Sequence, residues 1–207
     1  MSRAAVRFEA VVIGVSAGGL DALRAILPRL PENFGVPVIV VQHQAPGTND
    51  FFARFLDQRC AVRVKEAEEK EAAAPGTVYL APADYHLLIE DDRTFSLTLE
   101  NRVRFARPSI DVLFESAADV YGPRLIGIIL TGANDDGSHG LAAVKRQGGL
   151  TVVQDPGAAE VDTMPRAALA AASIDYVLPL AAIGPFLANL DKNGAFHSDG
   201  LVNSIRI

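Results

Sequence analysis

The segment VVIGVSAGG, residues 11–19, is an apolar run that ends in a serine followed by small residues. Two later segments repeat this pattern: VIVVQHQAP (38–46) brings a histidine after its apolar run, and GIILTGANDDG (127–137) brings two aspartates. Runs rich in Val and Ile are typical of strands buried on both faces of a parallel sheet. Because open α/β sheets bind ligands beyond the carboxyl ends of their strands, we expect the three polar ends to meet in one cleft.

The apolar runs alternate with helical patterns, which predicts an α/β fold: a three-layer α/β/α sandwich around a doubly wound, mostly parallel sheet. We expect strands near residues 9–15, 36–42, 125–130, 151–154 and 175–178. We expect helices over Gly19–Leu27, Asp50–Gln58, Ile110–Tyr121, Ser138–Gln147 and Pro165–Ala171, and a last helix after Pro179.

The segment from Thr77 to Leu99 breaks this alternation. Its apolar stretches are short, half-polar and separated by turn-like residues, which predicts a hairpin or small antiparallel extension. The preceding KEAEEKEAAAPG, residues 65–76, is charged and rich in alanine, and we interpret it as a solvated surface segment with room for a short helix. We expect one domain over residues 1–190 and a polar C-terminal tail over residues 191–207.

The 207-residue chain is 49% hydrophobic and carries a formal net charge of -6. This length and composition favour one domain with a substantial core, and the acidic balance argues against nucleic acid or an anionic membrane as a partner. The single cysteine, Cys60, cannot form an internal disulfide, and we expect a half-buried thiol at a helix end. No secretory signal or apolar stretch of membrane-spanning length is apparent, so we expect a cytoplasmic protein.

The five residues Gly14-Val15-Ser16-Ala17-Gly18 match the pattern G-x-S-x-G, with a predicted strand before them and a predicted helix after them. Such a turn exposes the Ser16 hydroxyl as a nucleophile, and the Ala17 amide at the helix start would face a developing oxyanion. Two other interpretations are a helix cap and a phosphate-binding turn. The phosphate turn would favour glycine at position 16 and an acidic residue about twenty positions later.

A serine hydroxyl needs a base to remove its proton, and imidazole has a suitable pKa for that role. Among the four histidines, His43 has the best position, at the end of the strand expected next to that of Ser16. His86 could line the same cleft, whereas His139 follows the aspartate loop and His197 lies in the tail.

A carboxylate would hold the histidine in one tautomer and stabilise its charged form. Asp135 and Asp136 both follow the third apolar run, and their spacing alone does not choose between them. Asp135 and His139 also have the spacing of two metal ligands on a helix, but a third ligand is not apparent.

Six short segments, taken in their order along the chain, resemble those of the catalytic domain of the CheB protein-glutamate methylesterases, and the resemblance covers roughly residues 10–190. The segments are GVSAGG, VVQHQAPG, RPSIDVLFESAA, ILTGANDDG, VVQDP and MPRAA. The resemblance implies an α/β/α sandwich with Ser16 as nucleophile, His43 as general base and Asp136 as the orienting carboxylate. It also implies that backbone groups at Ala17 and Ala133 stabilise the oxyanion.

The reaction implied by this resemblance is hydrolysis of γ-glutamyl methyl esters on chemoreceptors, with release of methanol and with glutamine deamidation as a related activity. No metal or organic cofactor is implied. Members of the family usually carry a preceding receiver domain, so we expect any such regulator to act here from a separate chain. Ala17 replaces the usual Thr and Ala133-Asn134 the usual Met-Gly, which changes the shape of the pocket.

Three arginines, Arg102, Arg104 and Arg107, precede the RPSID segment. They could attract an acidic receptor surface, with Arg107 lining the cleft, or they could form a solvated strand face, and we weigh these two interpretations equally. Three alternative functions also remain: an esterase for another signalling protein, a non-catalytic interaction module of the same fold, and a nucleotide-binding domain. The complete Ser, His and Asp set argues against the module, and Ser16 and Gln42 argue against nucleotide binding.

Overall fold

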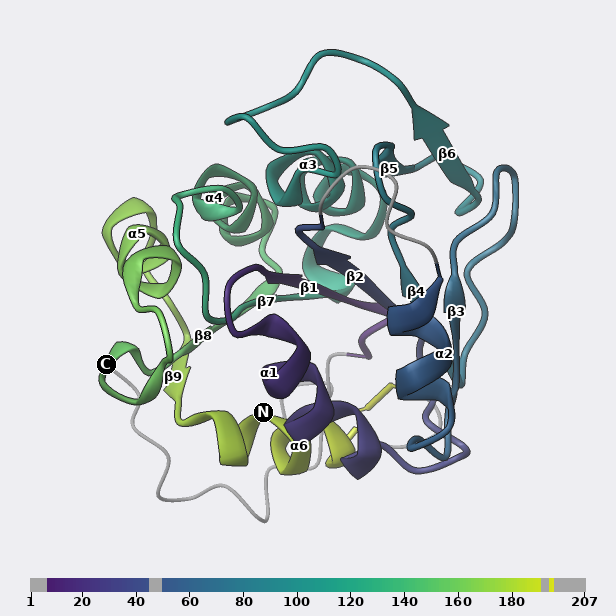
Figure 1. Cartoon of the computed structure of the whole chain (residues 1–207), viewed down its shortest axis with the longest axis horizontal. Coiled ribbons are helices and arrows are strands. Elements are labelled where there is room, and N and C mark those ends of the chain that lie inside the picture. Colours follow the sequence, from purple (N-terminus) through teal and green to yellow (C-terminus); the bar gives the residue numbers. More distant parts are fainter. Residues whose placement is uncertain (1–6, 45–49, 191–193, 196–207) are drawn as a thin grey trace, which may run out of the picture.

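The computed structural model describes residues 7–44, 50–190 and 194–195, and these form a seven-stranded sheet with helices on both faces (Figure 1). Every strand pairing in this sheet is parallel, in the order β3-β4-β2-β1-β7-β8-β9. The strands are β1 (Ala10–Val15), β2 (Val38–Gln42), β3 (Arg63–Glu66), β4 (Thr77–Leu80), β7 (Leu125–Ile129), β8 (Leu150–Gln154) and β9 (Tyr176–Leu178).

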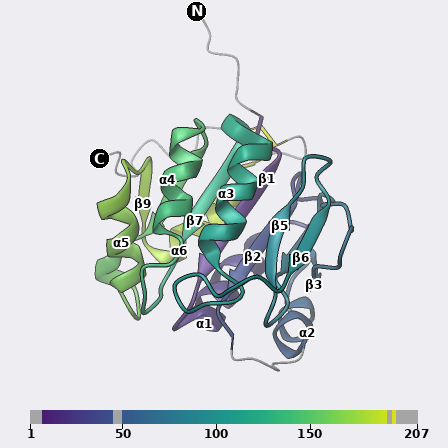
Figure 2. The same ribbon diagram turned by 90° about the horizontal axis from the view of Figure 1, so that it is seen from above.

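The helices divide into two layers, one on each face of the sheet (Figures 1 and 2). The helices α1 and α6 pack against each other on one face, and α3, α4 and α5 form a row on the other. The α-helices are α1 (Gly19–Ile26), α2 (Phe51–Asp57), α3 (Ile110–Tyr121), α4 (Ser138–Arg146), α5 (Thr163–Ala171) and α6 (Leu180–Ala188). Short 3₁₀ turns cover Leu27–Arg29, Gly122–Arg124 and Pro156–Ala158.

The central strand β1 explains why the apolar runs are continuous rather than alternating. Its residues Val11, Ile13 and Val15 point into the core beneath α1 and α6, while Ala10 and Val12 point into the core beneath α3 and α4. Both faces are therefore buried, as a parallel sheet between two helical layers requires. The three-layer α/β/α fold expected from the sequence is confirmed.

The order of the strands reverses at β1. The chain first extends from β1 through β2 toward β4 and β3, and it later returns to the other side of β1 with β7. A crevice opens at the carboxyl ends of the strands where such a reversal occurs, because the connections leave in opposite directions. Ser16, His43 and the loop after β7 all lie at this edge.

The antiparallel extension is smaller than the sequence predicted. It consists of β5 (His86–Ile89) and β6 (Phe95–Thr98), which pair with each other, and β5 packs on α3. The prediction was wrong for Thr77–Leu80, which form β4 inside the parallel sheet between β2 and β3. A four-residue strand without a helical pattern directly before it carries too little periodicity to reveal its partners.

The charged segment over residues 65–76 contains no helix. Its first two residues belong to the edge strand β3, in which only Val64 is fully buried. The ammonium group of Lys65 instead holds this segment together by binding Glu68 at 2.6 Å and Glu71 at 3.0 Å. The other expected helices and strands begin and end within two residues of those observed.

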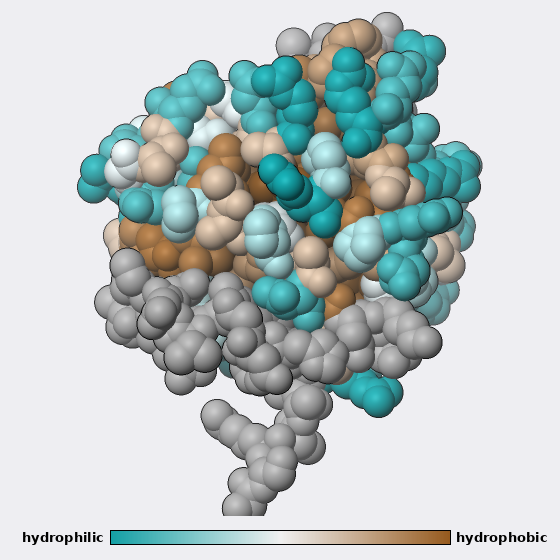
Figure 3. Space-filling view, turned by 90° about the horizontal axis from the view of Figure 1, so that it is seen from below, coloured by the Kyte–Doolittle hydropathy of each residue, from teal (hydrophilic) through white to brown (hydrophobic). Residues whose placement is uncertain are grey.

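The surface mixes hydrophilic residues with hydrophobic patches, as seen from the side that lies at the bottom of Figure 1 (Figure 3). None of the helices in the described ranges is long and apolar enough to cross a membrane. Large hydrophobic side chains that are exposed within those ranges are Phe51, Tyr85, Leu99 and Phe105.

Truncating Phe114 on α3 is expected to destabilise the fold strongly, because this side chain is completely buried in the core shared with the sheet. We expect Phe114→Ala to lower the free energy of unfolding by roughly 3–5 kcal/mol in urea denaturation. Phe51→Ala is the control, since Phe51 is on a helix but 53% exposed, and it should cost less than about 1 kcal/mol. Equal losses in the two variants would contradict this account of the core.

Candidate active site

Ser16 lies at a sharp turn between β1 and α1. Its amide donates to the carbonyl of Thr131 at 3.0 Å, and its own carbonyl accepts from the amide of Gly19 at 2.9 Å. A Cβ atom at Gly19 would lie 1.8 Å from the Gln42 side-chain oxygen, so glycine at this position lets the Gln42 side chain approach the turn closely. The Ser16 hydroxyl lies 3.2 Å from Nδ1 of His43.

His43 reaches Ser16 because their strands are neighbours in the sheet. Val15 and Gln42 are paired in the ladder between β1 and β2, and Ser16 and His43 are the next residue on each strand. The His43 amide donates to the carbonyl of Val15 at 3.1 Å, which extends this ladder by one bond. The side-chain amide of Gln42 then donates to the carbonyls of Ser16 at 3.0 Å and His43 at 2.9 Å, which ties the two turns together.

Asp136 is completely buried at the amino-terminal end of α3. Its Oδ2 accepts from Nε2 of His43 at 2.8 Å and from the amide of Ile110 at 2.7 Å. Its Oδ1 accepts from the Ser109 hydroxyl at 2.9 Å and from the amide of Asp111 at 3.1 Å. The carboxylate therefore takes up free donors at a helix start, where the helix dipole also favours a negative charge.

These contacts decide the protonation state of Asp136. Burial alone would raise its pKa, but the hydrogen bonds from His43 and from the amides of Ile110 and Asp111 outweigh burial, so the pKa is lowered. For Asp111, which accepts from the amide of Gly140 and from Arg104, burial dominates and the pKa is raised. Asp136 is thus an anion held against the imidazole of His43.

The orientation of the His43 ring follows from its two partners. Because ionised Asp136 can only accept, Nε2 carries the proton, and Nδ1 is left as the acceptor that faces the Ser16 hydroxyl. This is the reverse of the serine-protease arrangement, in which Nε2 faces the serine. A ring in this tautomer can receive the serine proton at Nδ1 while Asp136 stabilises the resulting imidazolium.

The backbone near Ser16 has two amides available to an external acceptor. Within the described residues, neither the Ala17 nor the Ala133 amide donates to another protein group. The carbonyl of Ala17 accepts from the Thr131 hydroxyl at 2.9 Å, and Gly132, just before Ala133, exchanges backbone hydrogen bonds with Val161 and Met164. The turns at Ala17 and Ala133 are therefore both held by the segment around Thr131 and Val161, while their own amides have no protein partner among the described residues.

The other histidines and the second aspartate lie apart from this cluster. His86 is 1% exposed; it accepts from the Ser109 amide and donates from Nε2 to the carbonyl of Asn101, so it is buried behind the site and does not line the pocket. Asp135 pairs with Arg104, whose guanidinium also lies 3.0 Å from the His139 ring. No cluster of three or more metal-ligating side chains occurs in the described ranges. His197 lies outside them.

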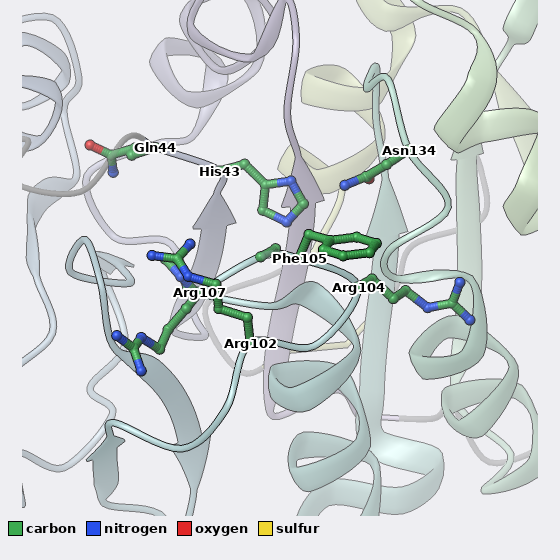
Figure 4. Close-up of a pocket in the computed structure, with 9 residues that line it drawn as sticks. His43, Gln44, Arg102, Arg104, Phe105, Arg107 and Asn134 are labelled. Carbon is green, nitrogen blue, oxygen red and sulfur yellow. The ribbon is translucent and has the colours of Figure 1, made fainter.

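A pocket of about 180 Å³ opens beside His43. Its wall on one side is a loop that carries the three arginines, and Asn134 faces His43 from the loop after β7 (Figure 4). Arg102 and Arg107 both bind the carboxylate of Asp84, at 3.1 and 3.2 Å. The arginines therefore do not form a solvated strand face: Arg107 does line the pocket, but each of the three is paired with a carboxylate.

Three polar residues hold the site together in ways that the sequence did not predict: Ser109 and Thr131 were given no role, and Gln42 was used only as an argument against nucleotide binding. Gln42 ends β2, and Thr131 follows β7. A polar side chain directly after an apolar run is therefore the sequence signal that could have marked both as site residues. Ser109 precedes a helix in the manner of an N-terminal cap, but here the carboxylate of Asp136 takes over the capping role.

Replacing Asp136 by Asn is expected to change how stability depends on pH. A lowered pKa means that the carboxylate stabilises the fold above the ordinary aspartate pKa of about 3.9, and that this stabilisation is lost as pH falls through the folded-state value. The free energy of unfolding of the wild type should exceed that of Asp136→Asn by on the order of 2 kcal/mol at pH 7, and this difference should shrink toward pH 3. Urea denaturation between these pH values measures it.

The control for this comparison is Asp135→Asn, which removes a partly exposed ion pair and should cost less than about 1 kcal/mol. A gap between wild type and Asp136→Asn that stays constant over the whole pH range would contradict the assignment of Asp136 as a stabilised anion.

Comparison with known proteins gives a consistent result. The family model described as CheB methylesterase matches residues 11–187. A protein of Leptospira interrogans, named provisionally as a protein-glutamate methylesterase/protein-glutamine glutaminase, is 54% identical over 188 residues, which cover 91% of this chain and 97% of that protein. A Carboxydothermus hydrogenoformans protein with the same two activities in its name is 42% identical over 87% of this chain, which spans only 54% of its length.

The fold comparison agrees with the sequence comparisons. The crystal structure of the Thermotoga maritima CheB methylesterase catalytic domain matches with a TM-score of 0.85 and 38% identity, covering 90% of this chain and 100% of that one. Family model, near-full-length relative and solved structure all span the strands and helices that surround Ser16, His43 and Asp136. The chain belongs to the CheB methylesterase family.

Proposed function

We propose that this chain is a protein-glutamate methylesterase that hydrolyses γ-glutamyl methyl esters on chemoreceptors, and that it deamidates glutamine by the same route. The observation that supports this most directly is the position of His43, in hydrogen-bond contact with both the Ser16 hydroxyl and the buried Asp136. The names of the relatives support a glutamate methyl ester and a glutamine amide on a protein as the groups acted on, the resemblance in the sequence suggests a chemoreceptor as that protein, and the pocket beside His43 provides room for a side chain.

In the first half of the proposed reaction, Ser16 Oγ attacks the ester carbonyl carbon and its proton passes to Nδ1 of His43. Asp136 stabilises the imidazolium through the bond at Nε2. The carbonyl oxygen becomes an oxyanion, for which the unpaired amides of Ala17 and Ala133 are the proposed donors. When the tetrahedral intermediate collapses, the methoxy group takes the proton from His43 and leaves as methanol.

In the second half, a water molecule attacks the acyl group on Ser16 and gives its proton to His43. Collapse of this intermediate returns the proton to Ser16 Oγ and releases the glutamate carboxyl group. With a glutamine substrate the same steps release ammonia in place of methanol. The cycle uses only the side chains and backbone amides named above.

We also propose that the substrate is encountered in the cytoplasm, as a chemoreceptor or a related signalling protein. Asn134 stands where the family usually has glycine, and its side chain faces His43 (Figure 4). This difference in the pocket is the feature that favours the alternative substrate, a signalling protein other than a chemoreceptor. Methanol release from a methylated chemoreceptor distinguishes the two substrates.

Ser16→Ala and His43→Ala are each expected to reduce methanol release by at least about 10³-fold, because each removes a group that takes part in every step. The measurement is methanol released from a methylated chemoreceptor, with unchanged melting temperature as the check on folding. His139→Ala is the control, since this histidine lies outside the cluster, and it should retain activity. Activity that survives Ser16→Ala would disprove the proposed nucleophile.

Gln42→Met is expected to lower kcat about tenfold with little change in KM. The methionine side chain has similar length but cannot donate to the carbonyls of Ser16 and His43, so nucleophile and base lose their common support. Gln147→Met, at the carboxyl end of α4, is the control, and steady-state kinetics measure both. An unchanged kcat in Gln42→Met would show that the ladder between β1 and β2 is sufficient for alignment.

A further inference from the structure

The wall of the pocket beside His43 ends in a very tight hairpin. Val103 and Ala106 exchange two backbone hydrogen bonds, of 3.1 and 2.8 Å, so that only Arg104 and Phe105 form the turn. Both of these residues have positive φ, 49° and 66°. Two-residue hairpin turns with positive φ at both positions normally carry Asn-Gly or similar pairs, because other side chains are strained there.

Phe105 has no evident structural role in this turn. Its side chain is 96% exposed, so it adds nothing to the core, and its backbone conformation is one that glycine would adopt without strain. Large apolar side chains are usually buried, and residues other than glycine usually avoid positive φ, so Phe105 departs from both preferences. Such departures occur preferentially at functional sites.

The hairpin is also held rigidly. At its tip, the Arg104 guanidinium pairs with the buried Asp111 and with Asp135. At its base, Arg107 binds Asp84 and donates to the carbonyls of Leu99 and Glu100, at 2.8 and 3.0 Å. The hairpin is thus anchored by charged contacts on both sides of Phe105, whose side chain stays exposed.

The position of this hairpin points to a protein segment as its partner. Phe105 lines the same pocket as His43 and Asn134 (Figure 4). Two more of the exposed hydrophobic residues flank the base of the hairpin: Leu99, whose carbonyl binds Arg107, and Tyr85, next to Asp84. A substrate side chain that reaches His43 would bring its own backbone and neighbouring residues close to Phe105, which lines the same pocket.

We propose that Phe105 is a substrate-recognition residue that packs against an apolar side chain next to the ester-bearing residue of the protein substrate. This inference rests on the proposed function and adds to it a requirement for an apolar neighbour on the substrate. Aromatic residues beside a pocket contribute strongly to protein–protein contacts because they bury a large apolar area with few rotatable bonds. A small ester that reaches only Ser16 and His43 would not need this contact.

The test is Phe105→Gly in the full chain, compared with Phe105→Tyr, which keeps an aromatic ring. In Phe105→Gly we expect an equal or higher melting temperature, because the turn loses its strain, together with a KM for methylated chemoreceptor raised about tenfold. The kcat for methylated chemoreceptor should fall much less than KM rises, because Ser16 and His43 are unchanged, and Phe105→Tyr should keep the wild-type KM. A matched control is Lys70→Gly, which relieves a positive φ of 63° in another turn and should leave KM unchanged.

Binding of the receptor to Ser16→Ala and to the double variant Ser16→Ala/Phe105→Gly separates recognition from turnover. Unchanged KM and unchanged binding after loss of Phe105 would overturn the inference and leave the proposed function standing. A drop in melting temperature together with a drop in kcat as large as the rise in KM would also overturn it, by showing a structural role. Phe105-dependent binding to a receptor that the wild type does not demethylate would overturn the proposed function alone.

Discussion

The buried carboxylate of Asp136 is the contact on which the rest of the site depends. Removing a carboxylate from water costs several kcal/mol, and this cost is offset only where strong donors surround both oxygens. Here the start of α3 supplies two amides and the Ser109 hydroxyl, and the turn after β2 supplies His43. The loop after β7, the start of α3 and the end of β2 must therefore be assembled together, and folding of the core produces the aligned imidazole.

Buried side-chain hydrogen bonds also hold the other strand ends in place. Gln42 joins the turns after β1 and β2, and Thr131 joins the turn after β1 to the segment around Val161. These side chains replace backbone partners where the sheet ladder stops. As a result the residues around Ser16 are held by hydrogen bonds from the end of β2 and from the turn after β7, and a site fixed in this way meets the condition for electrostatic preorganisation.

Much of the fold could be predicted because its central strands are buried on both faces and so appear as continuous apolar runs. The short outer strands could not: β4 has four residues, and β3 has one fully buried side chain. At the site, strand ends pointed to Ser16 and His43, but spacing left Asp135 and Asp136 equivalent. Their difference depends on donors around Ile110, 26 residues away in sequence, which only the packing of α3 brings close. For the three arginines the sequence left a docking role and a solvated strand face equally open, because the pattern does not show which carboxylates pair with them: Asp84 lies 18 residues from Arg102 and 23 from Arg107, and Asp135 lies 31 from Arg104.

The pairing of Val15 with Gln42 has a consequence for how the site could change. Nucleophile and base are the first residues beyond two hydrogen-bonded strands, so their separation is set by the spacing of the sheet itself. A slip of one residue between β1 and β2 would turn His43 to the opposite face of the sheet. Reactivity is thus coupled to register: whatever preserves the parallel ladder preserves the serine–histidine contact, and loops of any length can vary around it.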